Sequence, residues 1–443
     1  MSEKMIQEQE RKQMTIAEQK TASVLARKKQ YLLPCVYHFY QRPPVIVRGQ
    51  GVYLHGSDGK AYMDFFSGVS VNHLGHCHPA VTAAICAQAA TLCHTTTIYL
   101  TEPMLELAER LVAIAPVAGG KVFFCAGGSE ANETAAMVAQ NYTGRGGYAS
   151  LLNSLHGNSK LTLSLTGVGF WKTDLSPLPA VVHGPAPYCY RCPFGLREES
   201  CSLECADALE KTIAAAAVPV GCFFLEIIQA NGGIVVPPSR WFARLKEILA
   251  RHRILLVVDE VQTAFGRTGR MFASEHFALQ PDIITVAKSI GGGLPMGAAI
   301  ISEEVAARFT QPRASTFGGN PVVAKAGCAV LAVIDKEDLV ANASRLGDVL
   351  QTGLRRLQER HACIGDVRGL GLMVGCELVS ADGGPAAKMT DALLEEMKDA
   401  GFILGKGGQQ RNVLVFMPPL IIDEEGIVRV LQALDGVLQK NVT

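Results

Sequence analysis

Two polar residues each follow an apolar segment, and together they could act on a carbonyl compound. Asp259 comes directly after the apolar run 254–258, and Lys288 follows the run 283–286 by two positions. Open α/β sheets bind ligands at the carboxyl ends of their strands, where both side chains are therefore expected. Burial lowers the pKa of a lysine, and a neutral amine is a nucleophile for an aldehyde. A buried carboxylate needs a cationic or N–H partner, and a protonated ring nitrogen would serve.

A third segment has the pattern of a phosphate site. The strand-like run 121–125 leads through Gly127, Gly128 and Ser129 into a helix-like stretch. Free N–H groups at a helix N-terminus, with the Ser129 hydroxyl, can bind a phosphate. Taken alone, each feature has an ordinary interpretation, as a helix cap or as a solvent-facing lysine. A phosphate cradle, a partner for a pyridinium nitrogen and a buried amine together predict pyridoxal phosphate as the cofactor.

Helix-like stretches alternate with short apolar runs between residues 78 and 330. The helix-like stretches are 80–92, 103–114 and 241–251, and the apolar runs are 121–125, 222–227, 254–258 and 283–286. Such alternation predicts an α/β fold built from βαβ units around a mostly parallel sheet. A smaller α+β region is expected after it, with its signals at 367–378, 390–400 and 413–416. Residues 57–60 predict a hairpin turn near the N-terminus.

Composition excludes several functional classes. The chain has 41 Lys+Arg against 41 Asp+Glu, and this balance argues against a nucleic-acid partner, which requires a basic surface. No apolar run approaches the length of about 18 residues that a membrane span needs, so no membrane partner is expected. The N-terminus is polar and has no signal-peptide core, so we predict a cytoplasmic protein. Most of the 13 cysteines are then expected to be reduced thiols.

Nine ordered motifs resemble those of the class III aminotransferases, of fold type I among pyridoxal-phosphate enzymes. The motifs lie at 66–69, 75–79, 127–132, 156–157, 259–263, 265–269, 288–293, 316–321 and 368–373, so they cover nearly the whole chain. The resemblance implies a large domain with a mostly parallel seven-stranded sheet between helices, and a small α+β domain from both chain ends. The implied boundaries are an N-terminal arm at 1–30, a first part of the small domain at 31–75, a large cofactor-binding domain at 76–329 and the rest of the small domain at 330–443.

The resemblance also implies roles for three residues around the cofactor ring. Lys288 would attach the cofactor aldehyde as a Schiff base and then carry the proton that moves during transfer. Asp259 would pair with the pyridinium nitrogen and keep the ring an electron sink. Gln262 would contact the 3-oxygen of the ring.

Further implied contacts concern the phosphate and the subunit interface. Gly128 and Ser129 would hold the phosphate, and Thr316 would reach the phosphate of a neighbouring subunit. Glu226 occupies the glutamate of the family's Glu-Pro-x-x-Gly pattern, although Ile227 replaces the proline. Because Thr316 would act across an interface, each active site would be shared in a homodimer, with a tetramer of two dimers left open.

The sequence departs from the family pattern where the substrate should bind. Leu155 replaces the aromatic residue that stacks on the cofactor, so His156 is expected to take part of that task. Asn158 stands where ornithine-type members have an arginine for the substrate carboxylate. Asn231 and Val415 replace the gating Glu–Arg pair of those members, and losing both halves avoids a lone buried charge.

An anionic substrate would therefore need other donors, and Arg42, Arg368 and Arg411 are the candidates. The segment 405–420 resembles the alanine–glyoxylate type 2 branch, which also contains ammonia-lyases for amino-alcohol phosphates or phosphonates. The first hypothesis is an aminotransferase that moves an amino group from a small amine or amino acid to a 2-oxo acid such as pyruvate or glyoxylate. The alternative is an ammonia-lyase on a small amino-alcohol phosphate or hydroxy-aminoalkylphosphonate.

Four cysteines lie close together in the sequence, outside these motifs. Cys189, Cys192, Cys201 and Cys205 have a spacing that could suit a tetrahedral zinc ion. No other motif supports a metal there. We therefore favour reduced thiols in a loop and predict no metal.

Overall fold

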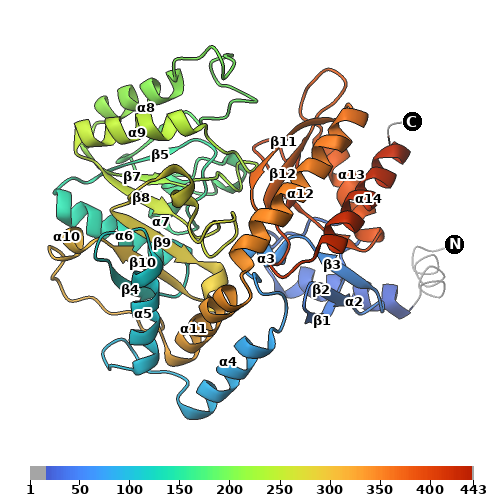
Figure 1. Ribbon diagram of the computed structural model, residues 1–443, viewed down its shortest axis with the longest axis horizontal. Helices are drawn as coiled ribbons and strands as arrows, with labels where there is room; N and C mark the ends of the chain where they lie inside the picture. Colours follow the sequence, from blue (N-terminus) through green and yellow to red (C-terminus); the bar gives the residue numbers. More distant parts are fainter. Residues whose placement is uncertain (1–15, 442–443) are drawn as a thin grey trace.

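The computed structural model describes residues 16–441, and its chain forms a large lobe and a smaller one (Figure 1). The large lobe contains a seven-stranded sheet in the order β4-β10-β9-β8-β7-β5-β6. Its strands are β4 (Lys121–Cys125), β5 (Gly147–Leu151), β6 (Val181–Gly184), β7 (Val220–Leu225), β8 (Leu255–Asp259), β9 (Ile283–Ala287) and β10 (Gly297–Ile301). Within this sheet, β10 runs opposite to the other strands and pairs antiparallel with β4 and β9. The prediction of a mostly parallel sheet is confirmed.

Helices cover both faces of this sheet. Every residue of β7, β9 and β10 is buried, although successive side chains point to opposite faces, so both faces must be covered. Helix α6 packs across β10 and β9. The helices of this lobe are α4 (Pro79–Thr91), α5 (Glu102–Ile114), α6 (Gly128–Thr143), α7 (Lys160–Leu165), α8 (Glu204–Ala214), α9 (Ser239–His252), α10 (Glu303–Ala306) and α11 (Pro321–Lys336), with 3-10 turns η1 (Gly169–Trp171), η2 (Ala273–Phe277) and η3 (Lys288–Gly291).

The smaller lobe is built from both ends of the chain. One sheet has the order β1-β2-β3-β13 and the other β11-β12-β15-β14. The strands are β1 (Ile46–Gln50), β2 (Tyr53–Gly56), β3 (Ala61–Asp64), β11 (Ile364–Leu370), β12 (Met373–Leu378), β13 (Phe402–Ile403), β14 (Gly405–Gly407) and β15 (Val413–Phe416), and the helices are α2 (Ile16–Tyr31), α3 (Ser67–Ser70), α12 (Leu339–Arg360), α13 (Ala387–Asp399) and α14 (Glu424–Asn441). Strand β13 pairs in parallel with β3, which joins the two chain ends in one sheet. This confirms the predicted fold class.

Most predicted elements lie within a few residues of their observed positions. The run 121–125 is β4, and the turn at 57–60 joins β2 to β3. The single apolar signal at 367–378 is instead the two-stranded hairpin β11–β12. Gly371 makes that reversal possible because its φ is +52° and a Cβ there would lie 2.4 Å from the Thr268 carbonyl carbon.

The predicted domain boundaries stay predictions. Of the predicted N-terminal arm, residues 1–15 lie outside the described residues, and α2 accounts for the rest. None of the helices between residues 16 and 441 combines the length and apolar character that a bilayer crossing requires.

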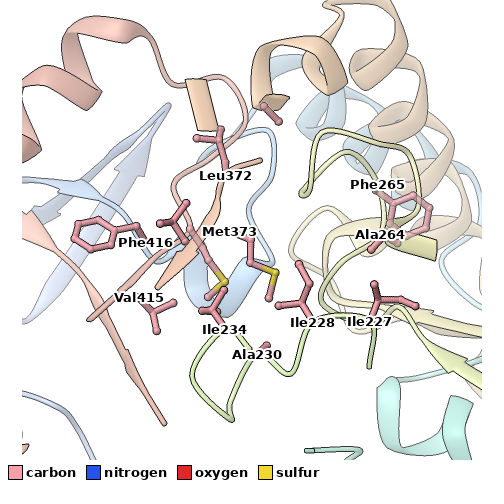
Figure 2. Close-up of a cluster of buried hydrophobic side chains, with 14 of the residues drawn as sticks. Ile227, Ile228, Ala230, Ile234, Ala264, Phe265, Leu372, Met373, Val415 and Phe416 are labelled. Carbon is pink, nitrogen blue, oxygen red and sulfur yellow. The ribbon is translucent and has the colours of Figure 1, made fainter. Parts of the chain in front are cut away.

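An apolar cluster joins the two lobes (Figure 2). The segment after β7 contributes Ile227, Ile228 and Ile234, while the small lobe contributes Met373 and Phe416 from neighbouring strands. All five side chains are buried. Burying a large apolar side chain stabilises the fold by roughly 1.5–3 kcal/mol. The segment that begins with Glu226 is thereby fixed against the small lobe.

Candidate active site

A cavity of about 380 Å³ lies at the carboxyl ends of β8 and β9. Asp259 ends β8 and Lys288 directly follows β9, and these strands pair in parallel, so both residues reach the same edge of the sheet. Eight of the nine predicted site residues line this cavity: Gly128, Ser129, Leu155, His156, Glu226, Asp259, Gln262 and Lys288. Thr316 does not line it and is exposed, in the segment before α11.

Asp259 is a buried carboxylate held by three hydrogen-bond donors. Its Oδ2 accepts from His156 Nδ1 and from Asn132 Nδ2, both at 2.8 Å, and its Oδ1 accepts from the Val261 amide at 3.1 Å. The residue is only 5% exposed. Since a carboxylate can only accept, His156 donates through Nδ1. These contacts fix the direction of the carboxylate and leave it without a Lys or Arg ion-pair partner among the described residues.

Asn132 lies in the site, although no role was predicted for it from the sequence. Its Nδ2 donates to Asp259 and also to the His156 carbonyl, and its Oδ1 accepts from Thr285 Oγ1 at 2.7 Å. Asn132 therefore ties α6, the segment before α7 and β9 to one carboxylate. A signal was present in the sequence, because a polar residue stands there on an otherwise alanine-rich helical face.

The ammonium group of Lys288 has a pKa below the usual value for a lysine. Its Nζ donates to Gln262 Oε1 at 2.8 Å. Burial lowers its pKa from 10.5 to about 8, although the negative charges of Asp259 and Glu226 oppose this shift. Its backbone φ of +54° lies in the left-handed region, which is strained for a side chain of this kind and is characteristic of functional positions. The geometry thus presents a largely desolvated amine that loses its proton easily.

The lowered pKa of Lys288 predicts how cofactor uptake depends on pH. The nucleophilic neutral amine becomes more abundant as pH rises through about 8. We expect the rate of pyridoxal-phosphate association with the cofactor-free protein to rise roughly tenfold between pH 7 and pH 9 and then to level off. Stopped-flow absorbance measures this rate, and the reaction of the cofactor with a free lysine derivative corrects for ionisation of the cofactor itself. A corrected midpoint near 10.5 would contradict the expectation.

Glu226 also lines the cavity and fixes the backbone of two nearby segments. Its Oε1 accepts from the Leu155 amide at 2.6 Å, and its Oε2 accepts from the Ala230 amide at 3.3 Å. Burial is the main cause that raises its pKa to about 7, and the neighbouring Asp259 adds to this. The first of these bonds holds the backbone of Leu155, which lines the cavity.

The N-terminus of α6 opens into the same cavity. The first amide groups of a helix have no partner inside the helix. Ser129 Oγ accepts from the Asn158 amide at 3.0 Å, and Gly157 with φ +137° lies so close that a Cβ there would be 2.3 Å from this oxygen. A glycine at 157 therefore leaves the space that Ser129 occupies. The hydroxyl proton of Ser129 stays available for an anion.

Comparison with known proteins identifies the family. The model of the family described as aminotransferase class-III matches residues 38–438. The chain belongs to the class-III aminotransferase family. An alanine–glyoxylate aminotransferase 2 homologue of Arabidopsis thaliana is 36% identical over 94% of this chain and 87% of that relative. A leucine/methionine racemase of Thermococcus litoralis is 39% identical over 89% of this chain and 90% of that relative.

A solved structure is similar over its whole length. A phospholyase from Arthrobacter in complex with phosphoethanolamine has a TM-score of 0.87 and 32% identity, and the match covers 94% of this chain and 99% of that one. Fold, family and aminotransferase activity agree with the sequence-based prediction. The chemistry of the relatives varies, so the substrate must be inferred from this chain's own residues.

Two of the arginines predicted as anion-binding candidates lie away from the cavity of this class-III aminotransferase. Arg42 has a side chain that is 77% exposed and pairs with Asp399 at 3.1 Å. Arg368 is enclosed by Glu377 at 2.8 Å, by Asp366 at 2.7 Å and by the Gly233 carbonyl. Both guanidinium groups are neutralised by their own neighbours, so neither is placed to bind a substrate.

Three of the four clustered cysteines lie in the loop between β6 and α8, and Cys205 lies in the first turn of α8. All four are free thiols. Within the described part of the chain, no group of three or more histidine, cysteine or acidic side chains is arranged to hold a metal ion. Burial raises the pKa of Cys189 to about 12 and that of Cys205 to about 11, which favours protonated thiols. Nothing in this arrangement links the cysteines to the cavity.

Proposed function

We propose that this aminotransferase binds pyridoxal phosphate in the cavity between Lys288 and Asp259 and transfers an amino group from a small amine or amino acid to a 2-oxo acid. The observation that supports this most directly is the meeting of an easily deprotonated amine, a fixed carboxylate and a helix N-terminus in one cavity. Each group alone has structural explanations. Together they match the aldehyde, the ring nitrogen and the phosphate of that cofactor.

The residues present fit the cofactor group by group. We assign the phosphate to the N-terminus of α6 with Gly128 and Ser129, where Gly128 leaves room because a Cβ would lie 3.0 Å from Val261 Cγ1. Asp259 suits a protonated ring nitrogen, since no Lys or Arg of the described residues forms an ion pair within 4.0 Å of its buried carboxylate. Gln262 is assigned to the 3-oxygen. When bound, the cofactor supplies an aldehyde that condenses with amines and a ring that withdraws electrons.

The side chains of this chain would hold and move protons around that ring. Asp259 would hold the proton on the ring nitrogen, and the hydrogen bonds from His156 and Asn132 keep its carboxylate fixed. The neutral amine of Lys288 would take the proton from the carbon beside the substrate nitrogen and would donate it again to complete the transfer. Gln262 keeps the amine in place through its 2.8 Å hydrogen bond.

We also propose a homodimer. Ile98, Tyr99, Leu100 and Phe317 are exposed by 63–81%, although all are large and apolar. Thr316 is adjacent to Phe317, and hydrogen bonds between Thr97 and Ser315 hold the two segments together. A second copy that covered this surface would place Thr316 at the interface, where the family resemblance assigns it to the phosphate of the neighbouring subunit. Equilibrium sedimentation should give twice the chain mass or a multiple of it; a monomer at micromolar concentration would contradict this. The predicted cytoplasmic location stays a prediction.

An ammonia-lyase is the second candidate, and one observation favours it. The similar phospholyase structure contains phosphoethanolamine, and this chain has Asn158 where the ornithine-type members have an arginine for the substrate carboxylate. Both reactions begin with removal of the same proton. A leaving group on the next carbon would divert the electrons to elimination.

One assay separates these functions. The purified holoenzyme is given candidate amines, amino acids and phosphoethanolamine, with and without pyruvate or glyoxylate, while ammonia and new amino acids are measured. We expect a new amino acid in amounts equal to the donor consumed, and only when an oxo acid is present. Release of ammonia without any acceptor would instead establish the lyase. Conversion of an L- to a D-amino acid without an acceptor would establish a racemase, as in the Thermococcus relative.

A further inference from the structure

We propose that Arg267 is a positioning residue that places Gln262, and through it the amine of Lys288, relative to the small lobe; this inference rests on the proposed function. Arg267 lies in the segment after β8, and its side chain is fully buried. Its Nη1 donates to two carbonyl oxygens of the small lobe, that of Leu372 at 2.9 Å and that of Pro418 at 2.6 Å. One guanidinium therefore ties the segment that follows β8 to the small lobe.

The charge of Arg267 is buried without a carboxylate beside it. No Asp or Glu of the described chain forms an ion pair with it within 4.0 Å, and its Nη2 has no hydrogen-bond partner there. Burial lowers its pKa to about 9, and the more distant charge of Asp64 opposes this shift. The group is therefore still a cation at neutral pH. Burying such a cation is costly, and an apolar side chain often stabilises a core as well or better. Packing alone thus explains this arginine poorly.

His73 links Arg267 to the backbone near the cavity. Its Nδ1 donates to the Phe265 carbonyl at 3.1 Å, because a carbonyl oxygen can only accept. Burial, followed by the charge of Arg267, holds the pKa of His73 well below its usual value, so the ring is neutral. Its Nε2 therefore has no proton and accepts from Arg267 Nε at 3.3 Å. Arg267 thus favours the tautomer in which His73 holds the Phe265 carbonyl.

Ser70 holds the same bend three residues earlier. Its Oγ donates to the Gln262 carbonyl at 3.2 Å and lies 3.1 Å from His73 Nε2. Ser70 ends α3, whose four residues all have φ between +51° and +67°. This left-handed region is unfavourable for residues other than glycine, and such strain is concentrated at functional sites. Ser70 and His73 therefore hold the bend between Gln262 and Phe265 at both of its ends.

Gln262 connects this bend to the reactive amine. Its Oε1 accepts from Lys288 Nζ at 2.8 Å, and its Nε2 donates to Met417 Sδ at 3.4 Å. Met417 directly precedes Pro418, whose carbonyl accepts from Arg267. A displacement of about 1 Å in such a group can lower a rate by about 100-fold. The contact between the lobes at Arg267 therefore sets where the amine lies.

The test measures the amine itself, in the cofactor-free protein. Formaldehyde with cyanoborohydride methylates neutral amines, and mass spectrometry of the Lys288 peptide gives the rate at each pH, relative to the exposed Lys336. For wild type we expect a midpoint near pH 8. In Arg267→Met and in Ser70→Ala the midpoint should rise by about 0.5–1 pH unit, because a displaced bend admits water and burial then lowers the pKa less.

Turnover of the holoenzyme gives the second measurement. In Arg267→Met and Ser70→Ala we expect kcat to fall by about 10- to 100-fold with little change in KM, because the amine is displaced while the substrate contacts remain. Arg267→Lys should recover part of the loss, since it keeps a buried cation that can donate to the two small-lobe carbonyls.

Arg145→Met and Ser150→Ala are the matched controls. The Arg145 side chain likewise donates to three backbone carbonyls, at 2.8–3.4 Å, and Ser150 is a buried serine whose Oγ donates to the Leu165 carbonyl at 2.7 Å. Neither residue lines the cavity. The midpoint of Lys288 and kcat should therefore equal wild type in both variants, even where the melting temperature falls.

A lower melting temperature in Arg267→Met with an unchanged Lys288 midpoint would overturn the proposal, because the arginine would then be a purely structural contact. Effects of Arg267→Met and Ser70→Ala that simply add in the double variant would also overturn it, since residues that act through one bend are not additive. If circular dichroism shows that Arg267→Met does not fold, Ser70→Ala and Arg267→Lys decide in the same way. A raised midpoint in a protein that transfers no amino group would support the positioning role and reject only the proposed function.

Discussion

Replacing Lys288 with alanine is expected to abolish turnover while the protein still folds. The substitution removes both the nucleophile and the proton carrier, and losses on the order of 10⁶ in kcat follow the removal of such a group. The Nζ–Gln262 contact is a single hydrogen bond, so its loss should affect folding little. The rate of amino-acid formation and the melting temperature measure the two effects separately.

Lys336→Ala is the matched control for this prediction, because Lys336 is an exposed lysine in the last turn of α11. We expect wild-type turnover from it. Residual turnover of Lys288→Ala above a few per cent of wild type would remove Lys288 from the proposed role, because no compensating base could supply so much of the rate.

Replacing Asp259 with asparagine is expected to have the second largest effect. The amide keeps the shape of the carboxylate but cannot hold a proton on the ring nitrogen, so the ring withdraws electrons less strongly. We expect kcat to fall by about 10²–10³, the usual loss when one preorganised electrostatic partner is removed. His156 Nδ1 and Asn132 Nδ2 would also face an amide in place of a charged acceptor. Presteady-state rates of the first half-reaction measure this effect without the second substrate.

Asp282→Asn is the matched control for this prediction. It makes the same change beside β9, the neighbour of β8, but at the end of the sheet away from Asp259. Asp282 precedes β9, and its Oδ2 accepts from the Leu256 amide at 2.7 Å, a bond that an asparagine oxygen can keep. Turnover should match wild type. Similar losses in Asp259→Asn and Asp282→Asn would mean that the effect comes from altered packing of the sheet and not from the ring nitrogen.

The strands that carry the site could be predicted because their signals are local. Short apolar runs that end in Asp259 and Ala287 mark the carboxyl ends of two strands, and parallel pairing then places the residues that follow at one edge. The hairpin of β11 and β12 escaped prediction because only Gly371 and Leu372 separate the two strands, so no cluster of polar turn residues marks the reversal.

Contacts between distant parts of the chain could not be predicted from the residues alone. The hydrogen bond from Asn132 to Asp259 joins residues 127 positions apart, and the bond from Gly169 to Gln409 spans 240. Nothing in the sequence distinguished Arg411 from Arg42 and Arg368 either. The structure separates them by their neighbours, since the last two have carboxylate partners and Arg411 has aromatic rings.

The central claim is that Lys288 is the residue that binds the cofactor aldehyde. Incubating the purified protein with pyridoxal phosphate, reducing it with borohydride and mapping its peptides by mass spectrometry tests this most directly. The account predicts one modified peptide, with the cofactor mass on Lys288, and none in the Lys288→Ala variant. Cofactor fixed to another lysine, or to none, would contradict it.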